Sequence, residues 1–224
     1  MKFLIPVLLA VLLVNCKRPF PKATKVEKPV AKPASAPKVA PPNYIKLIDV
    51  YVPLKFDTLQ VFSSSNLDSI GYKYRGVQLD STNAKVLGSN WQNIENYYAN
   101  FKFDIDEYKV GLITRVPSMY ESSSITLFIY DKNKKTLIEK LELAENWGDA
   151  GAVFEKRSWL FRDSKGRLKC LLHQSYYYDP KVNDEDASTA VDENNDYLIN
   201  LQHSVTDTVD RNAKVLFNKM KRLR

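Results

Sequence analysis

The side chains best suited to bind a ligand are aromatic residues beside a carboxylate. Segment 147–151 reads Trp-Gly-Asp-Ala-Gly and sets the Trp147 indole and the Asp149 carboxylate among small residues. A second aromatic cluster is Tyr176, Tyr177 and Tyr178. Aromatic rings stack on flat apolar faces such as those of sugars, and carboxylates accept hydrogen bonds. We favour a tight loop whose glycines permit unusual φ values and whose Trp147 fills the core. The functional alternative is a ligand pocket in which Trp147 stacks and Asp149 hydrogen-bonds.

An acidic stretch offers a different chemistry. Residues 179–196 hold seven acidic side chains against one lysine. Carboxylate oxygens bind Ca²⁺, but the spacing is not that of an EF-hand and the sixth-position glycine is missing. We expect a solvated loop here. The alternative is a calcium site formed by Asp184, Asp186 and Asp192, and we expect no other cofactor.

Catalytic signatures are absent from the sequence. Cys170 alternates with Leu168 and Leu172, which predicts a buried thiol on a strand. His173 follows three residues later and would point to the opposite face of that strand, out of reach of a nucleophilic cysteine. No G-x-S-x-G, G-x-x-x-x-G-K-[ST] or G-x-G-x-x-G segment occurs among the seven glycines. We therefore expect a protein that binds rather than catalyses.

The positive charge of the chain lies mainly at its beginning. The formal net charge is +7, but residues 1–42 carry eight basic residues and one acid, which leaves 25 of each sign in residues 43–224. A basic segment beside a neutral domain suits anionic headgroups or other polyanions of a cell envelope. The distribution argues against a nucleic-acid partner, which would call for a basic face on the domain.

The first sixteen residues explain why a membrane is expected. Lys2 precedes a nearly unbroken apolar run over residues 3–14, and Cys16 follows directly after Asn15. Twelve apolar residues are too few for a membrane-spanning helix and suit the h-region of a signal peptide. The segment resembles a bacterial lipoprotein signal peptide, with Leu13 at the usual leucine position three before the cysteine and Asn15 where Gly, Ala or Ser is usual. The resemblance covers these residues alone and implies cleavage before Cys16, acylation of Cys16 and a membrane as partner.

A proline-rich segment follows the cysteine. Seven of the eleven prolines fall in residues 17–42, and such a segment favours extended polyproline II, about 3.1 Å per residue. We predict three parts: a signal peptide (1–15), a lipidated Cys16 with its linker (16–42), and one globular domain (43–224). Lys17 and Arg18 stand where other lipoproteins carry an Asp that retains them in the inner membrane. By that resemblance we expect the periplasmic face of an outer membrane, or the cell surface in a bacterium with one membrane.

The domain is rich in Tyr, Phe, Ile, Leu, Val and Thr, which favour strands. Strands are predicted over 44–54, 56–62, 71–79, 99–105, 108–116, 124–130, 136–143, 153–161, 167–174 and 197–205. Residues 90–98 are ambiguous between helix and strand, and apolar residues at helical spacing predict a C-terminal helix within the last fifteen residues. The expected class is mainly β: an antiparallel β-sandwich, an open barrel or propeller-like sheets, with a short C-terminal helix.

These observations predict a lipid-anchored cell-envelope protein. Its domain is expected to be a non-catalytic binding or scaffold module, held away from the membrane by the linker, with an envelope protein or a glycan as partner. The alternative is a glycan-binding or glycan-processing envelope protein that uses Trp147, Asp149 and the tyrosines.

Overall fold

The computed structural model describes residues 44–63, 72–87, 96–118, 124–183, 190–202 and 213–220. The chain divides after Ala40, and all of these residues belong to its second part, Pro41–Arg224. Cys16, the linker before residue 43, most of the ambiguous segment 90–98, and Asp184 and Asp186 lie outside the described residues.

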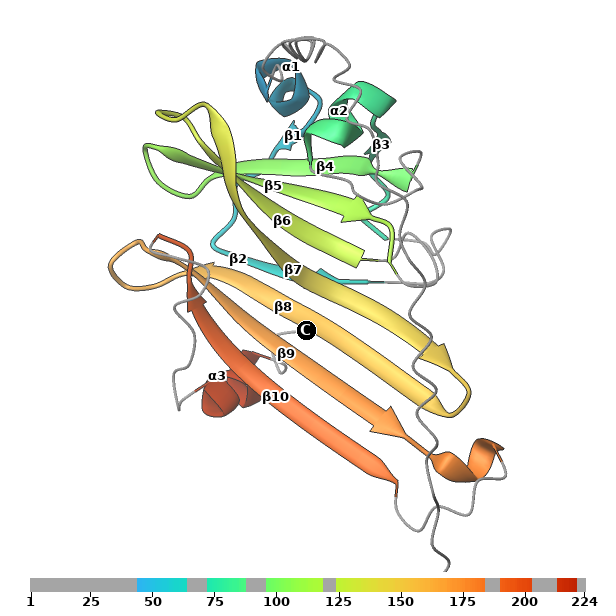
Figure 1. Cartoon of the computed structure of the whole chain (residues 1–224). Helices are drawn as coiled ribbons and strands as arrows, with labels where there is room; N and C mark the ends of the chain where they lie inside the picture. Colours follow the sequence, from blue (N-terminus) through green and yellow to red (C-terminus); the bar gives the residue numbers. More distant parts are fainter. Residues whose placement is uncertain are drawn as a thin grey trace, which may run out of the picture. The chain divides into compact units, whose positions relative to one another are not determined.

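The prediction of a mainly β domain is confirmed: the described residues form one unclosed sheet of ten strands (Figure 1). From β4 to β10 each strand is antiparallel to the next along the chain, whereas β1 pairs with β4 in parallel, β3 also pairs with β4, and β2 pairs with β8. The strands are β1 (Val52–Pro53), β2 (Thr58–Phe62), β3 (Val77–Gln78), β4 (Tyr98–Asp104), β5 (Lys109–Val116), β6 (Ser124–Asp131), β7 (Thr136–Asp149), β8 (Ala152–Arg162), β9 (Leu168–Tyr178) and β10 (Val191–Asn200).

The long strand β7 belongs to both halves of the sheet. Its first part, Thr136 to Ala144, pairs with β6, and its last part, Glu145 to Asp149, pairs with the beginning of β8. The rest of β8 pairs with β2. Strand β7 therefore joins the first half of the sheet, β4–β6, to the second half, β8–β10. Because β1 pairs in the first half and β2 in the second, the chain between β1 and β2 must cross from one half to the other.

Hydrophobic residues on both faces of the sheet are buried. One face of both halves contributes to a single central cluster that includes Ile113, Leu127, Leu160 and Cys170. The other face of the first half is covered by α1 (Tyr44–Asp49) and α2 (Ser81–Val86). In the second half that face is covered by α3 (Ala213–Met220). Strand β6 is buried at every position, and its sequence is apolar from Leu127 to Tyr130.

The prediction of a strand over 44–54 is wrong for its first part, which forms α1. Leu47 and Tyr51 are buried, and Tyr44 and Ile48 pack beside them. These four residues stand at i, i+3, i+4 and i+7, which is the spacing of a helix face rather than of a strand. The Tyr51 hydroxyl also forms a hydrogen bond of 2.7 Å with the Thr114 hydroxyl, which fixes the segment after α1 to β5. The predicted C-terminal helix is confirmed as α3, where Leu216, Phe217 and Met220 pack on the sheet.

Aspartates organise the tight turns between strands. The side chain of Asp131 accepts hydrogen bonds from the backbone N–H groups of Asn133 and Lys134. Asp163 accepts from the N–H groups of Lys165 and Arg167, and its second oxygen accepts from Arg167 Nε at 2.9 Å. Such side chains replace backbone partners that a turn leaves unsatisfied. The turns predicted at 131–134 and 163–166 are therefore present, each held by its first aspartate.

We expect Asp163→Ala to lower the melting temperature at neutral pH and to lose that effect in acid. The Arg167 side chain and two backbone N–H groups hold the pKa of Asp163 at about 2, below its usual 3.8. A carboxyl whose pKa is lower in the folded than in the unfolded state stabilises the fold at any pH above its unfolded-state pKa. That stabilisation is lost as the pH falls through its folded-state pKa. The difference in melting temperature between wild type and variant should therefore shrink between about pH 4 and pH 2. A difference in melting temperature that stays constant into acid would contradict the prediction.

Candidate functional site

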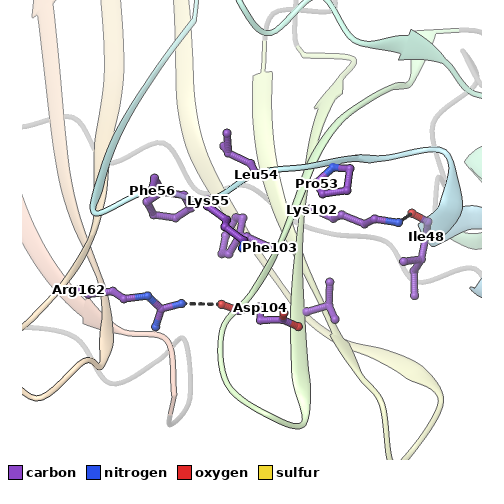
Figure 2. A pocket seen from close by; sticks show the side chains of 10 residues that line it. Ile48, Pro53, Leu54, Lys55, Phe56, Lys102, Phe103, Asp104 and Arg162 are labelled. Atoms are coloured by element: carbon purple, nitrogen blue, oxygen red, sulfur yellow. Dashed lines mark hydrogen bonds between the residues drawn. The ribbon is translucent and has the colours of Figure 1, made fainter.

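A hollow of about 640 Å³ lies where the chain crosses from β1 to β2 (Figure 2). Its size falls in the range of small-molecule sites, about 300–1,000 Å³. The lining residues come from the end of α1, β1, the crossing segment, β4, β5 and the end of β8: Ile48, Pro53, Leu54, Lys55, Phe56, Lys102, Phe103, Asp104, Val110 and Arg162.

Backbone hydrogen bonds hold the crossing segment at both ends. The Leu54 N–H donates to the Lys102 carbonyl at 2.8 Å, and the Arg162 N–H donates to the Asp57 carbonyl at 3.2 Å. Between these two attachments, Lys55 is exposed and Phe56 is half-buried. The segment therefore forms one wall of the hollow with a fixed position relative to β4 and β8.

The floor of the hollow is apolar and continuous with the core. The Phe56 and Phe103 rings meet edge to face with centroids 5.1 Å apart, and Leu54 and Phe56 pack against the central cluster. Phe103 is only 6% exposed. Gly111 on β5 makes room for its ring, since a Cβ at Gly111 would lie 2.6 Å from Phe103 Cζ.

Two cations of the hollow are held mainly by neutral groups. Lys102 Nζ donates to the Ile48 carbonyl at 2.9 Å and lies 3.9 Å from the exposed Asp49 carboxylate. Arg162 donates to the Asp104 carbonyl at 2.8 Å (Figure 2) and to the Gly166 carbonyl at 3.0 Å. Carbonyl oxygens orient both side chains but do not neutralise their charges, which for Lys102 the exposed Asp49 carboxylate offsets in part.

The remaining charged residues of the hollow leave it with an excess of positive charge. Lys55 has no hydrogen-bond or ion-pair partner among the described residues. The carboxylate of Asp104 is paired with Lys132 at 2.9 Å. The lining therefore presents three cations and one acid that already has a partner, which is an arrangement that attracts anions.

The lining combines charged and apolar groups. Four of its residues are charged, namely Lys55, Lys102, Asp104 and Arg162, and the other six are apolar. The hollow can therefore hold a ligand through both charge and apolar contact.

The structure brings two of the sequence-predicted site residues together. Trp147 on β7, Phe154 on β8 and Tyr176 on β9 are neighbours across the strands. The Trp147 and Phe154 rings are stacked 5.4 Å apart, and Tyr176 lies 6.4 Å from Trp147. We call these three half-buried residues the aromatic row. The sequence did not single out Phe154, although its place opposite Trp147 follows from a tight turn at residues 150–151.

The other members of that predicted site are placed less favourably. Asp149 and Tyr178 flank Ala152 in the next position along the same face, and Asp149 is exposed at the hairpin end. Tyr177 projects from the opposite face and is 42% exposed. The segment predicted as a possible loop is strand up to Asp149, and the turn is only Ala150 and Gly151, both with positive φ. This two-residue turn fits the twist of a β-hairpin.

The acidic stretch differs from its prediction where it is described. Asp192 lies on β10 rather than in a loop, is exposed, and accepts a hydrogen bond from Asn194 at 2.9 Å. No group of three or more His, Cys, Asp or Glu residues in the described part of the chain is arranged to hold a metal ion. Because Asp184 and Asp186 lie outside that part, the calcium site stays a prediction.

The expectations for Cys170 and His173 are confirmed. Cys170 is fully buried, and burial raises the pKa of its thiol to about 12, so that the reactive thiolate is suppressed. His173 lies on the other face, where its ring stacks on Phe217 at 3.9 Å and its Nδ1 bonds Asp196 at 2.9 Å. This pair lies beneath α3 and could not be recognised from sequence spacing, because its two residues are 23 positions apart.

The chain has no match among protein-family models, curated proteins or solved structures. Within the described ranges, no helix has the length and apolar character needed to cross a membrane.

Proposed function

We propose that this chain is a lipid-anchored protein of the bacterial cell envelope whose domain binds an anionic ligand in the hollow, without catalysis. The membrane is the partner, to which the acylated Cys16 attaches the protein, and segment 17–42 is the tether. By the lipoprotein resemblance, the proposed location is the periplasmic face of an outer membrane. The signal-peptide pattern supports the anchor, and the neutral charge of residues 43–224 supports a soluble module beyond a basic tether.

The observation that carries the proposed binding role is the charge arrangement of the hollow. Lys102 and Arg162 are oriented by carbonyl oxygens, while Lys55 is unpaired among the described residues. Charges beside an apolar wall act in a lower effective dielectric than charges in open water. A ligand anion would therefore gain from three cations, two of them held in position, and would displace little hydrogen bonding within the protein.

Binding of the anionic dye anilinonaphthalene sulfonate tests this role. The full chain carrying Cys16→Ser, prepared without detergent, should bind one dye molecule, and binding should weaken as salt is added. The double change Lys55→Met and Arg162→Met should weaken binding at least about tenfold, because a hydrogen bond to a charged group contributes about 1.5–3 kcal/mol. Lys140→Met, which removes an exposed lysine outside the hollow, is the matched control.

Two results would contradict the binding role. Equal dye binding by the double variant and the control would place the site elsewhere. Loss of binding in both variants would show that it depends on net charge alone. A melting temperature measured for each variant separates lost binding from lost folding, since folded variants retain a cooperative transition.

A second candidate function is glycan binding at the aromatic row, favoured by the alignment of Trp147, Phe154 and Tyr176 across three strands. Lys156 lies 5.5 Å from the centre of the Phe154 ring and is paired with Glu142, which adds polar groups beside the row. Envelope oligosaccharides should then quench tryptophan fluorescence in wild type and fail to do so in Trp147→Leu. Absence of quenching in the wild-type protein would remove this candidate.

A further inference from the structure

We propose that the ligand of the hollow is an anionic amphiphile: one acidic headgroup, a phosphate or a carboxylate, on a single apolar chain. This inference rests on the proposed binding role of the hollow and adds the chemical class of the ligand. Single-chain phospholipids and fatty acids both carry this chemistry, and the experiment below distinguishes their headgroups.

The lining has two chemically different parts. Six of its ten residues are apolar, and four are charged. An inorganic anion would satisfy the cations but leave the apolar wall of Leu54, Phe56 and Phe103 wet. A neutral hydrocarbon would cover that wall but take Lys55, Lys102 and Arg162 partly out of water without a counter-charge, which is unfavourable. Only a molecule with both parts matches the whole surface.

The exposure of the lining residues orients such a ligand. Phe103 and Val110 are buried, whereas Lys55 and Arg162 are exposed and the Lys102 side chain is 23% exposed. The cations therefore stand nearer to solvent than the deepest apolar groups. An acidic head would lie at the mouth beside the cations, and the apolar chain would point inward toward the Phe56–Phe103 pair.

The single acid of the lining sets the sign of selectivity. Asp104 offers its carboxylate to Lys132, and its carbonyl oxygen accepts from Arg162. A cationic head would meet three like charges and one acid that already has a partner. Removing the Asp104 charge should therefore strengthen the binding of acids, in contrast to the effect of removing any of the three cations.

Displacement of the bound dye tests the ligand class. The probes are octyl phosphate, octanoate, octanol, octyltrimethylammonium and inorganic phosphate, each below the concentration at which it forms micelles. The full chain with Cys16→Ser is used without detergent, because acyl chains and detergents would compete. Octyl phosphate and octanoate should displace the dye at concentrations at least about tenfold lower than the other three. Lengthening the chain from hexyl to octyl should strengthen displacement by about fourfold per methylene, as expected for hydrocarbon leaving water.

Variants separate the two halves of the hollow. Lys55→Met should weaken the binding of octyl phosphate and octanoate and leave the binding of octanol unchanged. Asp104→Asn should strengthen the binding of both acids. Phe56→Ala should reduce the gain in affinity for each added methylene, and Lys140→Met should leave all of these affinities unchanged. The relative order of octyl phosphate and octanoate assigns the headgroup, and either order supports the amphiphile.

The contrary outcomes are distinguishable. Displacement by inorganic phosphate as strong as that by octyl phosphate would overturn the amphiphile and leave the proposed anion site standing. Displacement by octanol as strong as that by octanoate would overturn both, since the cations would then contribute nothing. Failure of the Cys16→Ser chain to bind the dye at all would overturn the proposed function itself.

Discussion

Replacing Cys16 by serine should move almost all of the protein from the membrane fraction to the soluble fraction. Each buried methylene of an acyl chain contributes about 0.8 kcal/mol, and two or more chains hold a protein stably where one chain holds it only marginally. Serine offers no thiol for the thioether on which that acylation depends. Fractionation of cells followed by immunoblotting measures the effect.

The second cysteine provides a matched control for the anchor. Cys170→Ser changes the same atom at a fully buried position, and that variant should stay with the membranes. If the Cys16→Ser protein also stays with the membranes, the lipoprotein interpretation is wrong. Release of both variants would indicate that an intact fold, rather than an acyl chain, retains the protein.

Gly111→Ala should lower the free energy of unfolding by about 1–3 kcal/mol, the usual cost of overpacking a core. The added Cβ would lie 2.6 and 2.7 Å from two atoms of the Phe103 ring and 3.0 Å from Leu127 Cδ1. Both neighbours are buried, so neither can move away freely. Because Phe103 lines the hollow, its displacement should also weaken dye binding. Urea unfolding and dye titration measure the two effects.

Gly148→Ala is the control for that change. Its Cβ would have no neighbour closer than 3.4 Å, and its φ is not positive. The stability of this variant should stay near that of the wild type, within about 0.5 kcal/mol. Equal stability of the Gly111 and Gly148 variants would mean that Phe103 is less tightly held than its contacts indicate, and that the floor of the hollow can adapt.

The sequence predicted most of the sheet because strand signals are local. Alternation and apolar runs located the core of β4 to β9, and aspartates with turn-forming neighbours located the hairpins at 131–134 and 163–166. Helix α2 was missed although Asp80 caps it, with its carboxylate accepting from the Asn83 N–H at 2.8 Å. Its six residues bury only Ala84, too little apolar spacing to be recognised in a sequence.

Errors arose where tertiary contacts decide the structure. The acidic residues at the start of β10 lack strand preference, but the strand forms because all ten of its residues pair with β9. Likewise, segment 147–149 contains a glycine and an aspartate, which favour turns, yet pairing with β8 keeps it in β7. In both places, hydrogen bonding to the neighbouring strand outweighs the local conformational preference of the residues.

The hollow could not have been predicted from sequence spacing. Its cations Lys55, Lys102 and Arg162 are far apart in the chain and meet only because the segment after β1 crosses to β8. Each is an ordinary surface residue type in its own segment. By contrast, Trp147 and Asp149 stand out because only Gly148 separates them in the sequence, and the structure places Asp149 at an exposed hairpin end.

The most direct test of the binding role is a nuclear magnetic resonance titration of the Cys16→Ser chain with octyl phosphate. We expect the largest changes in amide chemical shift at Leu54, Lys55 and Phe56, at Lys102, Phe103 and Asp104, and at Arg162. Saturation with these residues affected would locate the ligand in the hollow. Changes concentrated instead at Trp147, Phe154 and Tyr176, or none that saturate, would contradict the assignment of the hollow as the ligand site.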